Sequence, residues 1–138
     1  MDIRQQIKPG LRVVFFVSDR TGLTAETYGR NLLAQFPQLE FETFTLAFIS
    51  NEDKAAHAVE LINLAHQISG VQPIVISSLV KKPLQRIVDA SSGQVIDLFH
   101  TFLGPLEAAL GMESAHKQGI SKHVLGSSVY QRRLDAID

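Results

Sequence analysis

Residues 18–24 bring hydroxyl, carboxylate and guanidinium groups together around a glycine, in the run Ser18-Asp19-Arg20-Thr21-Gly22-Leu23-Thr24. The hydroxyls can donate hydrogen bonds, Arg20 adds a positive charge, and Gly22 permits a tight turn. A helical pattern follows at once, and the amino terminus of a helix attracts anions. These features indicate a site for an anion or a partner. The same residue types are equally typical of ordinary helix capping, and spacing alone leaves both interpretations open.

Four segments have the pattern of buried strands, and three of them are each followed by a helical pattern of ordinary length. The expected strands are Val13–Val17, Phe41–Ile49, Pro73–Ser78 and Val95–Phe99. The expected helices are Ala25–Phe36, about 52–69, a third beginning at Pro83, a short one over Gly104–Gly111, and a last one over Val129–Asp138. Alternation of this kind predicts right-handed crossovers and a mainly parallel sheet of about four strands. We therefore expect a three-layer α/β/α domain, Rossmann-like or flavodoxin-like.

We divide the chain into a polar amino-terminal lead, residues 1–11, and one α/β domain, residues 12–138. The lead has no apolar core, so it is not a signal peptide. No apolar run approaches the roughly 20 residues of a membrane span. Thirteen basic and fourteen acidic residues give a net charge of -1, which argues against nucleic acid or an acidic membrane as a partner. We expect a cytoplasmic protein.

Common catalytic and cofactor motifs do not occur in the sequence. Cysteine is absent, and no glycine is followed by lysine, so the phosphate-binding loop G-x-x-x-x-G-K-[ST] occurs nowhere. His57 and His66 are nine residues apart on one expected helix, which does not suit a metal pair. His100 follows Asp97, where a capping or surface role is the simpler interpretation, and His116 and His123 lie in a weakly patterned basic stretch. We expect no metal, bound cofactor or catalytic residue in this chain.

The segment Val14-Phe15-Phe16-Val17-Ser18-Asp19-Arg20-Thr21-Gly22-Leu23-Thr24-Ala25-Glu26 resembles the start of a known bacterial family. These are the regulatory proteins of phosphoenolpyruvate synthase and pyruvate, phosphate dikinase, which begin with a strand and then S-D-x-T-[GA]-x-T-A-E. The similarity continues at Gln35-Phe36-Pro37, at Pro105-Leu106-Glu107 with Leu110-Gly111, and at Tyr130 with Arg133, Ala136 and Ile137. It covers the chain from about residue 12 onward. Many members have glycine where this chain has Arg20.

The resemblance implies a bifunctional serine/threonine kinase and pyrophosphorylase. Members use ADP to phosphorylate a threonine beside the catalytic histidine of the target enzyme, and they reverse this with inorganic phosphate, releasing pyrophosphate. The family's phosphate-binding loop belongs to a second, carboxyl-terminal domain that lies beyond residue 138. The helical pattern at Asp138 also stops without a capping residue. We therefore expect an amino-terminal domain without its kinase half, inactive when alone.

In this interpretation, Ser18, Asp19, Arg20, Thr21, Gly22 and Thr24 line a cleft that binds an anion or the target enzyme. Two other hypotheses remain open. The isolated chain could be a non-catalytic target-binding or dimerisation module, with a homodimer as one assembly. It could also be an unrelated flavodoxin-like domain for a small molecule, although no catalytic base or cofactor motif favours that hypothesis.

Overall fold

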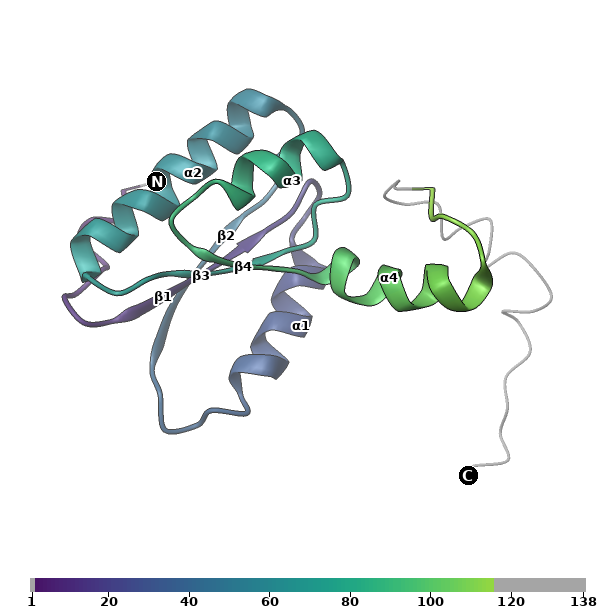
Figure 1. Ribbon diagram of the computed structural model, residues 1–138. Coiled ribbons are helices and arrows are strands. Elements are labelled where there is room, and N and C mark those ends of the chain that lie inside the picture. Colours follow the sequence, from purple (N-terminus) through teal and green to yellow (C-terminus); the bar gives the residue numbers. More distant parts are fainter. Residues whose placement is uncertain (1, 116–138) are drawn as a thin grey trace.

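The computed structural model describes residues 2–115, which form a four-stranded sheet with helices on both faces (Figure 1). In chain order the elements are β1 (Arg12–Val17), α1 (Leu23–Leu33), β2 (Phe41–Leu46), α2 (Glu52–Ser69), β3 (Ile74–Ser77), α3 (Lys82–Asp89), β4 (Gln94–Asp97) and α4 (Leu98–Leu110). The expected helix over Val129–Asp138 lies outside the described residues. None of the helices within 2–115 is long and apolar enough to cross a membrane.

The sheet is entirely parallel, with the strand order β2-β1-β3-β4. Val14 of β1 is in register with Thr43 of β2 on one side and with Ile74 of β3 on the other. The predicted crossover topology is therefore confirmed, and the domain is a three-layer, Rossmann-like α/β fold. The chain leaves β1 toward β2 and later leaves β3 toward β4, in opposite directions across the sheet.

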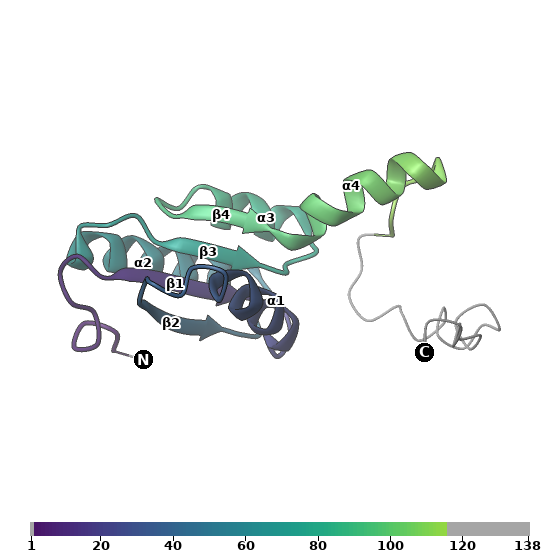
Figure 2. The same ribbon diagram turned by 90° about the horizontal axis from the view of Figure 1, so that it is seen from below.

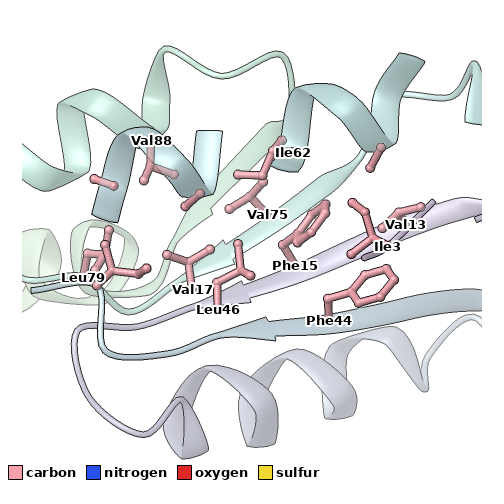
Figure 3. Packing of buried hydrophobic residues seen from close by; sticks show 14 of the residues in the cluster. Ile3, Val13, Phe15, Val17, Phe44, Leu46, Ile62, Val75, Leu79 and Val88 are labelled. Atoms are coloured by element: carbon pink, nitrogen blue, oxygen red, sulfur yellow. The ribbon is translucent and has the colours of Figure 1, made fainter. Parts of the chain in front are cut away.

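The central strand β1 is buried on both faces because both faces are covered by helices. Alternate residues Val13, Phe15 and Val17 face α2 and α3, while Val14 and Phe16 face α1. Figure 3 shows the larger of the two clusters, where side chains from three strands meet those of α2 and α3. Because both faces of β1 are buried, every residue from Val13 to Val17 is apolar, and the sequence shows a continuous β-branched and aromatic run.

The layer on the other face depends on a close approach of α1 to β1. A Cβ atom on Gly29 would lie 2.3 Å from Phe16 Cε1, so only glycine allows this spacing. The Arg30 guanidinium carbon lies 5.3 Å from the centre of the Phe16 ring, which is within the range of a cation–π contact. The packing of α1 thereby fixes the direction from which its amino terminus meets the sheet.

Two predicted boundaries are wrong at the carboxyl ends of strands. The second strand ends at Leu46 rather than Ile49, because Phe48 adopts a left-handed conformation with φ 59°. The fourth ends at Asp97, and α4 begins at the next residue, so the expected short helix is the second half of a longer one. The Asp97 carboxylate accepts a hydrogen bond from the His100 amide (3.0 Å) and so caps α4.

The amino-terminal lead is packed against the domain. Ile3 and Ile7 are buried in the same cluster as Phe15 and Ile62. Because Ile3 and Ile7 stand singly among polar residues, the sequence shows no helical or strand periodicity there that could predict their burial. The lead therefore adds apolar burial on the face that α2 and α3 cover.

Candidate functional site

The turn after β1 lies at the point where the topology of the sheet reverses. In open parallel sheets, ligands bind in the crevice outside the carboxyl ends of the strands at this position. Here the two strands are β1 and β3. The loop after β3 adjoins the turn, because the Ser78 amide donates a hydrogen bond to the carbonyl of Val17 (2.9 Å). The structure thus places the predicted residues where this fold binds ligands.

Ser18 is a structural anchor of the turn. It is only 2% exposed, and its amide donates to the carbonyl of Leu46 (3.1 Å) while its own carbonyl accepts from the Ile49 amide (2.9 Å). Its hydroxyl oxygen accepts a hydrogen bond from the Arg20 amide (3.0 Å). These bonds join the turn after β1 to the end of β2 and fix the backbone of the turn.

A second connection between the two strand ends passes through Phe48. Its amide donates to the carbonyl of Arg20 (2.8 Å), and its side chain is 58% exposed. A left-handed conformation costs a side-chain-bearing residue roughly 1–2 kcal/mol. Such strain is common at binding sites, where the surrounding structure maintains it. Sequence analysis missed this residue, because nothing in its neighbourhood predicts a positive φ.

Gly22 begins α1 and also has a positive φ, 88°. Its carbonyl accepts the first helical hydrogen bond, from the Glu26 amide (2.9 Å), and Gly22 itself has no side chain that could cap the helix. Thr21 Oγ1 accepts from the amide of Leu23 (3.3 Å), a local bond of the kind that the capping interpretation expects. The Thr24 side chain is exposed. The helix terminus carries a partial positive charge, and one of its amides, that of Leu23, already bonds Thr21.

The charged groups of the turn lie at its surface. Arg20 is exposed, and Asp19 is half-buried. Behind them, the Glu26 carboxylate accepts a hydrogen bond from the Thr45 hydroxyl, which ties α1 to β2. Of the six predicted residues, Ser18 and Gly22 shape the turn, Asp19 is half-buried, and Arg20, Thr21 and Thr24 are exposed.

A pocket of about 520 Å³ lies beside the turn, between the end of β2 and the start of α2. Its lining includes Phe48, Ile49, Asp53, Lys54, His57 and Leu61. The volume falls within the range of small-molecule sites, and the lining combines apolar surface with a few polar groups. Because Phe48 contributes to both features, a molecule bound at the turn can also contact this pocket.

The remaining histidine predictions concern sites away from the turn. His66 Nδ1 lies 2.9 Å from Ser92 Oγ, which links α2 to the loop before β4. Within residues 2–115, no three histidine, aspartate or glutamate side chains come together in a way that could hold a metal ion.

Burial raises the pKa of the Asp97 carboxyl, and the hydrogen bond from the His100 amide lowers it by a smaller amount. The capping role expected for this pair is confirmed, and His116 and His123 lie outside the described residues.

Comparison with known proteins agrees with the motif and the fold. A family model described as kinase/pyrophosphorylase matches residues 14–138. The chain belongs to this family. Its amino-terminal motif thus sits on the β1–α1 turn of the family's α/β domain, and the predicted resemblance is confirmed.

Three curated relatives bear the name "Putative phosphoenolpyruvate synthase regulatory protein". The one from Alkalilimnicola ehrlichii is 43% identical over 127 residues, which cover 92% of this chain and 46% of the relative. That from Herminiimonas arsenicoxydans is 45% identical over 130 residues, covering 94% and 46%. That from Hahella chejuensis is 42% identical over 127 residues, covering 92% and 47%. The chain therefore spans about half the length of these relatives.

Proposed function

We propose that this chain is the α/β part of a regulator of phosphoenolpyruvate synthase or of pyruvate, phosphate dikinase. In this proposal the complete regulator transfers a phosphoryl group from ADP to a threonine of its target, leaving AMP, and it later transfers that group to inorganic phosphate, which forms pyrophosphate and frees the threonine. Membership of the kinase/pyrophosphorylase family and the name of the relatives support the proposal. The single observation that carries the site assignment is the position of the family-like motif at the switch point between β1 and β3.

The turn supplies recognition rather than phosphoryl transfer in this proposal. The amino terminus of α1 attracts an anionic group, and Arg20 adds a full positive charge at the surface. A phosphorylated or carboxylate-bearing segment of the target enzyme would supply such a group. Phe48 offers an exposed aromatic surface beside it for an apolar part of the same partner.

Phosphoryl transfer itself requires a loop that cradles phosphates, and the G-x-x-x-x-G-K-[ST] pattern is absent from this sequence. We therefore assign ADP and inorganic phosphate to a part of the regulator outside this chain. The chain's own contribution is the target-facing or anion-facing wall of the cleft.

The test uses a full-length relative, such as the protein from Herminiimonas arsenicoxydans, with the residues aligned to Asp19 and Thr21 changed to alanine. Thr21→Ala removes one local hydrogen bond, worth about 1 kcal/mol of stability. The matched control is Asn63→Ala, which removes a comparable bond to the Ser92 amide (2.8 Å) elsewhere in the domain. The proposal expects all variants to fold, with threonine phosphorylation of phosphoenolpyruvate synthase sharply reduced only in the first two. Activity that falls equally in the control would show that the turn is only structural.

A further inference from the structure

Strand β2 forms one edge of the sheet. Within residues 2–115 it pairs with β1 alone, and Figure 2 shows it at the border of the sheet with β1 on its inner side. The carbonyl of Leu46 accepts from the Ser18 amide, so the backbone groups of Leu46 are turned toward β1. Because alternate residues of a parallel strand bond opposite neighbours, the backbone groups of Thr43 and Thr45 are turned outward. Such an edge is a template for pairing with one more strand.

The pocket of about 520 Å³ lies beside the end of this edge strand, on the face of the sheet that α2 covers. Leu46 lines it from the sheet, and Lys54 and Leu61 line it from α2. In an added strand, every second side chain would point to this face of the sheet. Most of the lining is apolar, and the opposite charges of Asp53 and Lys54 balance each other. The pocket therefore favours an uncharged apolar side chain over a multiply charged small molecule.

Phe48 lines the same pocket in a conformation that is unfavourable for a bulky side chain. Its φ is 59°, and its side chain is 58% exposed, so burial of the ring does not compensate the left-handed backbone. Residues held in this way are concentrated at binding sites. The Phe48 amide also donates to the carbonyl of Arg20 (2.8 Å), which joins the pocket to the turn after β1. One partner can therefore contact the turn, the pocket and the edge together.

Carboxylates on β2 indicate the charge of that partner. Glu40 precedes the strand and Glu42 lies within it, and neither has an ion-pair partner among residues 2–115. A basic residue in an added strand would pair with them. The β2 strand of a second copy would not supply one, because residues 41–46 contain no lysine or arginine. The edge is therefore complementary to a different protein segment.

We propose that an extended segment of the target enzyme pairs with β2 as an additional strand, inserts an apolar side chain into the pocket against Phe48, and places a basic residue beside Glu42. In recognition of this kind, main-chain hydrogen bonds supply affinity, and the pocket for an alternate side chain supplies specificity. The inference rests on the proposed function, because it takes the target enzyme as the partner. It adds the conformation and the chemistry of the segment that is recognised.

The first test measures amide hydrogen exchange of this chain, alone and with purified phosphoenolpyruvate synthase or pyruvate, phosphate dikinase. Exchange of the outward amides in residues 41–46 should slow by at least about tenfold when the target enzyme is bound. The matched control is β4, residues 94–97, the other edge strand of the described sheet, where exchange should not change. Unchanged exchange in residues 41–46 with the target bound would overturn the proposal. Slowing that appears as this chain alone is concentrated would also overturn it, by showing that a second copy occupies the edge.

The second test uses Phe48→Gly, which separates binding from stability. The variant should be about as stable as the wild type in urea, because relief of the left-handed strain offsets the greater freedom of glycine in the unfolded chain. Loss of the ring should nevertheless weaken binding of the target enzyme at least about tenfold in titration calorimetry. The matched control is Phe102→Ala, since this phenylalanine is 56% exposed on α4 and does not line the pocket. Its Kd should equal that of the wild type.

The two proposals fail in different ways. If Asp19→Ala and Thr21→Ala weaken binding but Phe48→Gly does not, the added strand is refuted and recognition by the turn stands. If the wild type binds neither enzyme, both proposals are refuted.

Discussion

Replacing Gly22 with alanine should destabilise the domain through two separable effects. The first is conformational, because the residue has φ 88°, where a side chain costs roughly 1–2 kcal/mol. The second is steric, because the new Cβ would lie 2.6 Å from Thr45 Cγ2. Moving Thr45 away also disturbs its hydrogen bond to Glu26, a further loss of about 1 kcal/mol. We expect the free energy of unfolding to fall by about 2–4 kcal/mol.

Gly10→Ala is the matched control for the conformational effect. Gly10 has a similar φ of 83°, but no atom lies within 4 Å of the position that its Cβ would take. Urea denaturation followed by circular dichroism gives the free energy of unfolding of both variants. Gly22→Ala should be less stable than Gly10→Ala by about 1–2 kcal/mol, the steric part of the effect.

A second substitution tests the cause directly. Thr45→Ser removes Cγ2 but keeps the hydroxyl that bonds Glu26. In a double-mutant cycle it should recover about 1 kcal/mol in the Gly22→Ala background. Equal stability of the Gly10 and Gly22 variants, or a coupling of zero with Thr45→Ser, would refute the described packing of the turn.

Three further results are expected. Gly29→Ala should cost about 1–3 kcal/mol in urea unfolding, because the Phe16 ring must move, and a stable variant would contradict the close approach of α1. Burial raises the pKa of the Asp97 carboxyl, so near neutral pH the charged form lowers the stability of the wild type, and Asp97→Asn should be at least as stable. As the pH falls through that pKa the wild-type carboxyl becomes neutral, and the stability advantage of Asp97→Asn should shrink. Asp97→Ala loses the cap of α4, about 1 kcal/mol of stability. This chain alone should not transfer phosphate from labelled ADP to phosphoenolpyruvate synthase, and labelling of the target threonine would disprove that assignment.

The layers and topology could be predicted because their signals are local and repeated. The run from Val13 to Val17 indicated a strand buried on both sides, and the end expected for the second helix at about residue 69 agrees with α2, which Gly70 ends with φ 73°. Alternation of strands and helices then left few topologies open. The position of the turn at residues 18–22 followed from the same reasoning.

The parts that could not be predicted depend on contacts between distant residues. The end of β2 is set by the bond from Phe48 to the Arg20 carbonyl, which no pattern near Phe48 announces. Burial of Ile3 depends on a surface formed by α2 and β1. The start of α4 at Leu98 reflects the Asp97 cap, whereas apolar residues at that point equally suit a continuing strand.

We propose that the turn after β1 recognises the target enzyme. Titration calorimetry of this chain against purified phosphoenolpyruvate synthase, and separately against pyruvate, phosphate dikinase, tests this recognition most directly. With the enzyme that is the natural target, wild type and Asn63→Ala should bind with the same Kd, whereas Asp19→Ala and Thr21→Ala should bind at least about tenfold more weakly, or about 1.4 kcal/mol. Equal binding by all four proteins, or no binding of the wild type to either enzyme, would contradict the account.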